Sequence, residues 1–409
     1  MKILVITQHY WPEQFNITEI CEGLASKGHE VCVLAGLPNY PSGVIPEEYR
    51  RGKNRLQVHN NVTIIRVKEI ARGKAGIIKR ALNYFSYVAS SCLKVRSLKD
   101  FDIIFGYQTS PIYQMQAARI AKRLTGKPLF IYCTDLWPES LLSKMKSRDN
   151  LLYKLTESYS QKTYNEADAI VVTSQYFIEY INTVNKVPLE RISYIPQHAS
   201  GLFLRVKSQE RRENEKPVFL FAGNIGKAQS LETIVEAAHT IKDKDFVVNI
   251  VGDGSELASL KELVALRGLT DKFNFFGWHP IEEMPEFYGQ AHACLLTLKR
   301  IPAVEMTMPA KLQGYMAAGK PVFAAINGAA RDVIEESRCG GCVDIEDGAA
   351  LGELMGDFID NPEKYAHCGQ NARDYFKEHF EEMAVTNMME NALLSVIAKD
   401  EKTAMNGGN

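Results

Sequence analysis

The segment KILVITQHYWPEQFNITEICEGLASKGHEVCVLAG, residues 2–36, decides the fold class. It begins with an apolar run of strand length, passes through a polar loop into an amphipathic helical pattern, and ends in a second apolar run at 30–35. Gly28 stands where a helix commonly ends in a left-handed conformation. A strand, a helix and a second strand in this order predict a βαβ unit with parallel strands.

The same alternation continues along the chain and then restarts. Helical patterns separate most of the further expected strands, at 62–67, 102–107, 128–133 and 169–173. After a charged, apolar-poor stretch at 205–217, a second series follows at 218–222, 246–251, 273–276, 293–297 and 321–325. We therefore expect an α/β protein of two Rossmann-like, doubly wound domains, residues 1–205 and 206–382, facing each other across a cleft. An amphipathic helix at about 383–400 could pack on either domain, including back on the first.

The composition is that of an ordinary globular protein. Of 409 residues, 48 are Lys or Arg and 49 are Asp or Glu, so no global field favours nucleic acid. No stretch reaches the roughly 18 apolar residues needed to cross a bilayer, and the N-terminal apolar run is too short for a signal peptide. Eight scattered cysteines, mostly in apolar runs, are typical of buried thiols in a reducing compartment. We expect a cytoplasmic protein that needs no metal or cofactor.

A glycine-rich turn opens the second series. In FLFAGNIGKAQSLETIVEAA, residues 219–238, a strand ends before Gly223, and Gly226 permits a tight turn before a helix. Free amides at a helix start favour a phosphate, and Lys227 adds a positive charge. An ordinary tight turn without a ligand is the alternative.

Further ligand-binding candidates follow in the same domain. VGDGSE at 251–256 and FFGWHP at 275–280 each turn on glycine after a strand, which places Gly252, Asp253, Gly277 and Trp278 near a ligand. Trp278 could stack on a planar base or cover the core. In MPAKLQGYMAAGKPV at 308–322, a helix starting near the proline directs Lys311 and Gln313 toward the same crevice as Lys227. Two lysines at one place suggest a diphosphate.

Polar groups also follow strands in the first half. YCTDLWPES at 132–140 places Thr134, Asp135 and Glu139 at a strand end, where carboxylates bind sugar hydroxyls or act as acid or base. Capping of the next helix is the alternative. The loop QHYWPEQFNIT at 8–18 follows the first strand and contributes three polar candidates, which are Glu13, Gln14 and Asn16.

The segment 66–99 is basic and aromatic. It holds nine Lys and Arg residues against the single acid Glu69, interleaved with Ile, Leu, Tyr and Phe. A basic helix with exposed aromatic residues is typical of proteins that lie on an anionic bilayer, with Lys74, Lys79 and Arg80 as the contacts. A solvated helix face with an ordinary core side is the alternative.

Five ordered motifs resemble one known family. GHEVCVLAGLPNYPSG, DLWPES, AGNIGKAQSLET, VGDGSE and MPAKLQGYMAAGKPV together are similar to family 4 glycosyltransferases of the two-domain GT-B type. The resemblance covers nearly the whole chain and is greatest to a bacterial subgroup of L-fucosamine transferases of O-antigen and capsule synthesis.

The resemblance implies a retaining transfer of a sugar, such as N-acetyl-L-fucosamine or another N-acetylated amino sugar, from a UDP-sugar without a metal. The acceptor is implied to be a saccharide linked to undecaprenyl diphosphate, with the enzyme peripheral on the inner face of the cell membrane. The first domain would bind the acceptor and the second the donor. Lys227 and Lys311 would neutralise the leaving diphosphate, and Asp135 would belong to the catalytic set.

The chain departs from the family pattern at several positions. Asn224 replaces an arginine of the family, and Met306 and Gly314 replace its two glutamates. Glu305 or Gln313 could take over part of their role. Thr134 stands where many relatives carry a histidine, so a histidine-based role before Asp135 is in doubt.

Two alternatives to a transferase stay open. A GT-B nucleotide-sugar epimerase would share both domains and the UDP site, with Asp135, Glu139 and His198 as its acid and base groups. A non-catalytic sugar-nucleotide-binding subunit would explain the missing glutamates.

Overall fold

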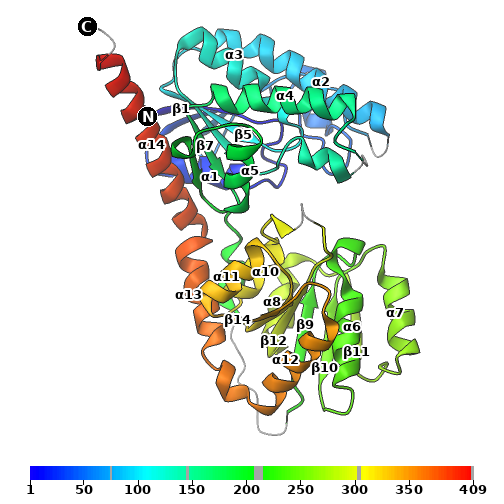
Figure 1. Cartoon of the computed structure of the whole chain (residues 1–409). Helices are drawn as coiled ribbons and strands as arrows, with labels where there is room; N and C mark the ends of the chain where they lie inside the picture. Colours follow the sequence, from blue (N-terminus) through cyan, green and yellow to red (C-terminus); the bar gives the residue numbers. More distant parts are fainter. Residues whose placement is uncertain (74–75, 144–146, 207–214, 302–304, 407–409) are drawn as a thin grey trace. The chain divides into compact units, whose positions relative to one another are not determined.

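The computed structural model describes residues 1–73, 76–143, 147–206, 215–301 and 305–406 (Figure 1). Two compact units form: Met1–Gln197 with Val385–Asn409, and His198–Ala384. The N-terminal unit ends its first segment at Gln197, whereas the sequence predicted the boundary at 205, where the charged segment begins. Phe203 and Val206 explain this difference, because both are buried in the hydrophobic core of the second unit.

The N-terminal unit contains a sheet of eight strands in the order β3-β4-β2-β1-β5-β6-β7-β8. All neighbours pair in parallel except β3 and β4, which form an antiparallel edge. The strands are β1 Lys2–Ile6, β2 Glu30–Ala35, β3 Leu56–His59, β4 Val62–Arg66, β5 Ile103–Gln108, β6 Leu129–Cys133, β7 Ala169–Val172 and β8 Ile192–Tyr194. The doubly wound α/β fold expected for this half is confirmed.

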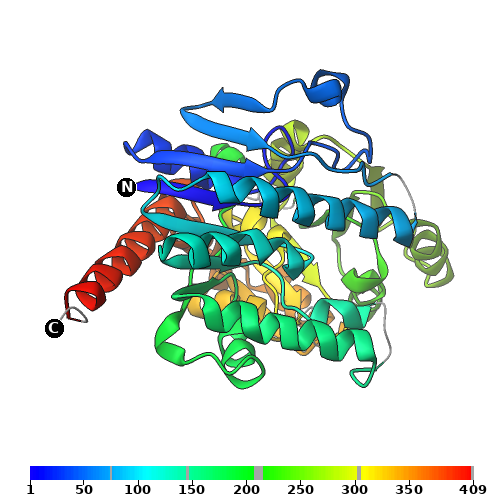
Figure 2. The same cartoon turned by 90° about the horizontal axis from the view of Figure 1, so that it is seen from above.

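Helices cover both faces of this sheet. Figure 2 shows α2, α3 and α4 side by side over one face, and Figure 1 shows α1 and α5 on the other. Their bounds are α1 Ile17–Ser26, α2 Ile77–Lys94, α3 Gln116–Thr125, α4 Leu151–Glu166 and α5 Tyr176–Thr183. Buried strand residues such as Ile3 and Val5 pack with α1, because alternate side chains of a strand point to the same face.

The C-terminal helix α14, Glu382–Asn406, packs on the N-terminal unit. Val385, Met389 and Leu393 lie in the same hydrophobic cluster as Ile20 and Leu24 of α1. Glu390 adds polar contacts, since Lys27 donates to one of its oxygens at 2.5 Å and His29 contacts the other at 2.6 Å.

The C-terminal unit contains a parallel sheet of six strands in the order β11-β10-β9-β12-β13-β14. These strands are β9 Val218–Ala222, β10 Val247–Val251, β11 Phe273–Gly277, β12 Ala293–Thr297, β13 Val322–Ala325 and β14 Gly340–Val343. The helices are α6 Leu231–Thr240, α7 Leu257–Leu266, α8 Met284–Gln290, α10 Ala310–Ala317, α11 Ala329–Ser337, α12 Gly348–Asp360 and α13 Cys368–His379. The doubly wound fold is confirmed here too.

Two clusters of buried residues fill the faces of the second sheet. Phe219 and Phe221 of β9 belong to one cluster, with α6, α7 and α12. Leu220 and Ala222 belong to the other, with α8, α10, α11 and α13. This alternation along one strand is the pattern of a sheet that is buried on both sides.

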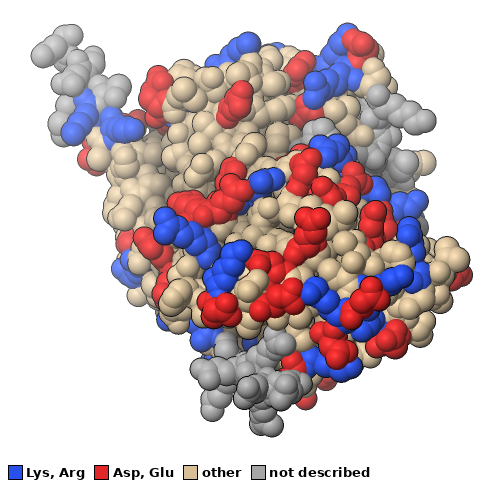
Figure 3. Space-filling model, turned by 60° about the horizontal axis from the view of Figure 1, so that its bottom comes forward, with Lys and Arg blue, Asp and Glu red and all other residues tan. Residues whose placement is uncertain are grey.

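Charged side chains of both signs are mixed over the surface that Figure 3 draws. This mixture agrees with the net charge of −1. Among the described residues, none of the helices combines the length and the hydropathy that a bilayer-spanning segment needs.

Candidate functional site

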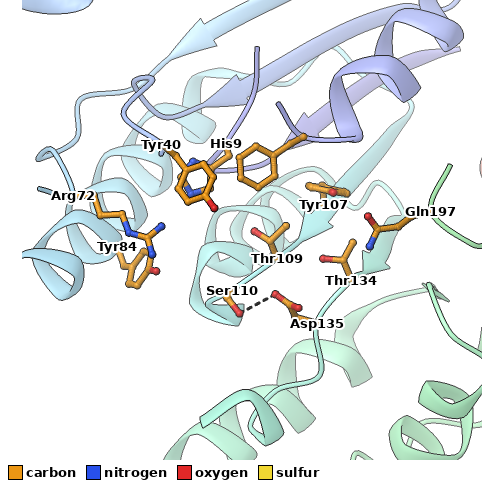
Figure 4. Close-up of a pocket in the computed structure, with 11 residues that line it drawn as sticks. His9, Tyr40, Arg72, Tyr84, Tyr107, Thr109, Ser110, Thr134, Asp135 and Gln197 are labelled. Carbon is orange, nitrogen blue, oxygen red and sulfur yellow. Dashed lines mark hydrogen bonds between the residues drawn. The ribbon is translucent and has the colours of Figure 1, made fainter. Parts of the chain in front are cut away.

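A cavity of about 320 Å³ lies in the N-terminal unit (Figure 4). It opens beyond the carboxyl ends of β1, β5 and β6, which are neighbours in the sheet. The strand order reverses between β1 and β5, and ligands of doubly wound sheets bind at such a reversal. The lining residues are His9, Phe15, Tyr40, Arg72, Tyr84, Tyr107, Thr109, Ser110, Thr134, Asp135 and Gln197.

His9 is a cavity residue that the sequence analysis did not single out. It follows β1, and its Nδ1 lies 2.9 Å from Oε2 of Glu13. The ring stacks on Phe15 with 4.8 Å between centroids. An N–H group on Nδ1 can donate to the Glu13 carboxylate, which leaves Nε2 as the ring nitrogen that is available to a ligand. A histidine directly after a strand, with a glutamate four residues later, was the available sequence signal.

Asp135 stands on the opposite side of the cavity in Figure 4. Ser110 donates a hydrogen bond of 2.9 Å to its Oδ2, and Trp137 donates one of 3.0 Å to Ser110. Burial raises the pKa of Asp135 above its usual value, and the hydrogen bond from Ser110 opposes that shift. The structure therefore brings the predicted Asp135 and Thr134 to one cavity with His9.

Among the described residues, three other predicted acceptor residues, Glu13, Gln14 and Asn16, do not line the cavity. Glu13 is buried, and its Oε1 accepts from the backbone N–H groups of Asn39 at 2.7 Å and Tyr40 at 2.6 Å. Gln14 is exposed, and Asn16 precedes α1 without a capping hydrogen bond from its side chain. Neither residue belongs to the cavity lining among the described residues.

Glu139 also lies outside the described cavity lining. Its Oε1 accepts hydrogen bonds from Tyr153 at 3.0 Å and Tyr180 at 3.1 Å, and it forms a salt bridge of 3.0 Å with Arg148. These partners occupy the carboxylate, so Glu139 ties together the segments on which they lie.

In the C-terminal unit, the turns after β9, β10 and β11 are joined by their backbones. Gly223 donates to Val251 O at 2.8 Å, and Gly252 donates to Gly277 O at 2.8 Å. Gly252 has a φ of 142°, and a Cβ there would lie 1.9 Å from Gly223 O. The predicted Gly252 is thus required by the close approach of the turns after β9 and β10.

Lys311 of α10 lies against the first of these turns. A Cβ on Gly223 would come within 2.4 Å of Lys311 Cε, and Nζ lies 5.1 Å from the ring centroid of Phe221. The Nζ has no carboxylate in salt-bridge contact among the described residues, and burial lowers its pKa to about 8. Tyr315, on the same helix, accepts from Ala222 N at 3.1 Å and so fixes α10 to the end of β9.

Lys227 and Asn224 lie on the turn that follows Gly223. Lys227 is exposed at the start of a 3-10 turn, Lys227–Gln229, which precedes α6. Asn224 is exposed and donates a hydrogen bond of 3.2 Å to Gln229 Oε1. The β9 to α6 connection therefore carries one basic side chain, Lys227, and contacts a second, Lys311 of α10, at Gly223.

The remaining predicted donor residues differ in their exposure and in their contacts. Trp278 is 72% exposed, so its alternative role as a cover of the core is wrong. Asp253 caps its own turn by accepting from Gly254 N at 2.7 Å. Gln313 is buried in α10. Glu305 lies next to the start of α11, where a Cβ on Gly328 would lie 2.1 Å from Glu305 O.

Two of the three predicted membrane residues, Lys79 and Arg80, lie on α2. Ile78 is 77% exposed and Phe85 68%, and Leu82 lies between them on the same helix. Lys79 is exposed and Arg80 is half-buried beside this apolar surface, while Lys74 lies outside the described residues.

The described part of the chain holds no group of three His, Cys, Asp or Glu residues that could bind a metal ion.

Two protein-family models match this chain, one within each unit. A model of the family described as Glycosyltransferase Family 4 matches residues 16–197, and one described as Glycosyl transferases group 1 matches residues 204–375. WcaI of Escherichia coli K12, whose name assigns it to colanic acid biosynthesis as a glycosyl transferase, is 25% identical over 338 residues, covering 78% of this chain and 82% of WcaI.

Solved structures share the fold at low identity. Sucrose-phosphate synthase of Thermosynechococcus elongatus has a TM-score of 0.72 at 16% identity, covering 97% of this chain and 99% of its own. Anabaena HepE, solved in complex with UDP, has a TM-score of 0.70 at 14% identity, covering 97% of this chain and 100% of its own.

Proposed function

Since this chain belongs to glycosyltransferase family 4 and has the GT-B fold, we propose that it is a retaining enzyme that moves a sugar from a UDP-sugar to a lipid-linked saccharide. The proposal assigns the donor to the C-terminal unit and the acceptor to the cavity of the N-terminal unit. The product would be part of a cell-surface polysaccharide.

The observation that carries the proposal is the half-buried ammonium group of Lys311 at the Gly223 turn. Among the described residues no carboxylate forms a salt bridge with it, and a cation partly withdrawn from water in this way is costly unless a ligand supplies the negative charge. A diphosphate does so, and Lys227, on the turn that Lys311 contacts at Gly223, adds a second charge. HepE, which shares the fold, was solved with UDP, and this supports a uridine nucleotide as the donor.

The reaction breaks the bond between the anomeric carbon and the diphosphate oxygen and forms a bond from that carbon to an acceptor hydroxyl on the same face. The hydroxyl proton passes to the leaving diphosphate, so the charge that develops on UDP is stabilised where Lys311 and Lys227 bind it. His9 and Asp135 would orient the acceptor hydroxyl, because both line the cavity and carry hydrogen-bonding atoms.

Cell-surface polysaccharide synthesis is supported by the name of WcaI and by the motif resemblance to L-fucosamine transferases. The proposed donor is therefore a UDP-linked N-acetylated amino sugar, such as N-acetyl-L-fucosamine, and the pathway is O-antigen, lipopolysaccharide or capsule synthesis. An acceptor on undecaprenyl diphosphate would require the enzyme to work at the cytoplasmic face of the membrane, where the exposed apolar and basic side chains of α2 could bind lipid.

A donor screen tests this function. The full chain is incubated with a panel of UDP-sugars, with and without lipid-linked acceptors, and products are identified by mass. Transfer only in the presence of acceptor is expected. Isomerised UDP-sugar without acceptor would instead support the epimerase alternative. Tight UDP binding without turnover on any acceptor would support the non-catalytic subunit.

A further inference from the structure

Arg72 is a cation at one side of the acceptor cavity. Figure 4 shows its guanidinium beside the rings of Tyr40 and Tyr84, on the side away from Asp135. Its Cζ lies 5.3 Å from the ring centroid of Tyr40. The backbone is fixed as well, because Arg72 N donates a hydrogen bond of 3.0 Å to Asn39 Oδ1. The side chain is therefore held in place as part of the cavity wall.

The charge of Arg72 is not neutralised within the described residues. The acids near the cavity are engaged elsewhere: Glu13 with His9 and two backbone amides, and Asp135 with Ser110. The buried Glu69 accepts hydrogen bonds from Asn39 and Asn83. An arginine that lines a cavity and forms no salt bridge there is suited to an anionic group of the ligand.

A second cation, Lys79, lies near the backbone of the residue that follows Arg72. The side chain of Lys79 packs against Gly73, where a Cβ would lie 2.9 Å from Lys79 Cδ and 3.9 Å from its Nζ. Lys79 belongs to the first turns of α2, which also carries Tyr84 in the cavity wall and the exposed Ile78. Helix α2 thus carries an exposed apolar residue, Ile78, a basic residue, Lys79, and a residue of the cavity lining, Tyr84.

Resting on the proposed function, we propose that Arg72 and Lys79 form an anion subsite that binds the diphosphate joining the acceptor sugar to its lipid. The aromatic and polar part of the cavity then holds the sugar, and the apolar residues of α2 contact the lipid. The apolar, cationic and polar side chains on and beside α2 thus supply one kind of contact for each of the three parts of such an acceptor, which are lipid, diphosphate and sugar.

The subsite is tested by calorimetry on the full chain saturated with UDP. The probes are farnesyl diphosphate, farnesol, inorganic pyrophosphate and glucuronic acid. Farnesyl diphosphate is expected to bind, and Arg72→Gln to weaken it by about tenfold or more, since charge-assisted contacts are among the strong ones. Arg72→Lys should restore part of this loss, and Lys79→Gln should weaken binding less. Farnesol affinity should not change in any variant.

The matched control is Arg96→Gln, which removes an exposed guanidinium near the other end of α2. Unchanged farnesyl diphosphate affinity in Arg72→Gln, with UDP binding intact, would overturn the subsite. Arg72-dependent binding of glucuronic acid in place of farnesyl diphosphate would assign the subsite to a sugar carboxylate and overturn the diphosphate assignment. If the wild-type chain does not bind UDP at all, the proposed function itself is wrong. Failure of the subsite and failure of the proposed function are thus distinguishable.

Discussion

Nδ1 of His9 lies 2.9 Å from Oε2 of Glu13, and both side chains are buried, with His9 lining the cavity of the N-terminal unit and Glu13 behind it. The other oxygen of Glu13 accepts from the N–H groups of Asn39 and Tyr40. One carboxylate therefore holds a histidine ring and the loop after β2 in a fixed relation. This arrangement resembles the way that a carboxylate selects the tautomer of a functional histidine.

We expect His9→Asn to lower turnover about a hundredfold, because it keeps a donor toward Glu13 but removes the ring nitrogen that faces the acceptor. Glu13→Gln should also lower turnover, since the amide N–H₂ group opposes a proton on Nδ1. The measurement is the rate with saturating UDP-sugar, together with UDP affinity, which should not change. Wild-type rates in His9→Asn would exclude a role in transfer.

The pKa of Lys311 leads to a second prediction. Burial lowers it to about 8, so the free enzyme loses the ammonium charge as the pH rises through that value. UDP affinity should therefore fall between about pH 7 and about pH 9.5, and Lys311→Arg should remove this fall because a guanidinium stays charged. Calorimetric titration with UDP across this range is the measurement.

Lys311→Ala should weaken UDP binding about tenfold or more at neutral pH and should bind UDP without the alkaline fall. Lys227→Ala should cost less, since that side chain is exposed. The matched control is Lys242→Ala, an exposed lysine of the same unit. A pH-independent wild-type affinity that survives Lys311→Ala would refute the diphosphate assignment.

Much of the fold follows from local pattern, because parallel strands that are buried on both faces have apolar runs of recognisable length. The expected strands at 62–67 and 218–222 correspond to β4 and β9. The sequence analysis missed β3, Leu56–His59, and β8, Ile192–Tyr194. Both lie at sheet edges, where polar residues such as Gln57, His59 and Ser193 interrupt the apolar pattern.

The proposed donor residues and the cavity residues also differ in how far they could be predicted from the sequence. Glycines after strands and Lys311 lie in short motifs, so the donor residues could be proposed from sequence. The acceptor cavity takes Tyr40 from the loop after β2, Arg72 from the segment before α2, and Tyr84 from α2 itself. Only tertiary packing brings such separated positions together, so no spacing rule pointed to them.

The contact between Gly252 and Gly223 predicts a large effect of a single methyl group. Gly252→Ala would place Cβ 1.9 Å from Gly223 O at a φ of 142°, so the turn that supports Lys311 must move. We expect a loss of about 3 kcal/mol in stability and a loss of UDP binding. Gly268→Ala is the control, since its φ is also positive but a Cβ there meets nothing within 4 Å. Equal melting temperatures of the two variants would contradict this account.

Membrane binding by α2 can be tested by charge reversal. Lys79→Glu with Arg80→Glu should weaken sedimentation with anionic vesicles, since each basic residue near the surface contributes about 1 kcal/mol. Phe85→Ser should weaken binding to anionic vesicles as well, because this ring is 68% exposed. Lys162→Glu with Lys242→Glu makes the same charge change at exposed positions elsewhere. Equal binding by all of these variants would show that the exposed side of α2 is an ordinary solvated face of a helix whose other side packs in the core.

We expect Glu69 to make the stability of the protein depend on pH. The side chain is 5% exposed, and its Oε1 accepts hydrogen bonds from Asn39 at 2.5 Å and Asn83 at 2.7 Å. Among the described residues, two oxygens of this network, Glu69 Oε2 and Gln8 Oε1, have no donor. A proton on Glu69 would supply one, and burial indeed raises its pKa to about 8.

Because the folded pKa lies above the unfolded value of about 4.5, the folded chain keeps a proton that the unfolded chain releases between these two values. This contribution to stability is complete below about pH 4.5 and is lost as the pH rises toward 8. Glu69→Gln, a neutral side chain of the same shape, should remove the fall. Thermal unfolding of both proteins between about pH 5 and about pH 8 measures the difference, and parallel curves would mean that Glu69 is already ionised in the folded protein.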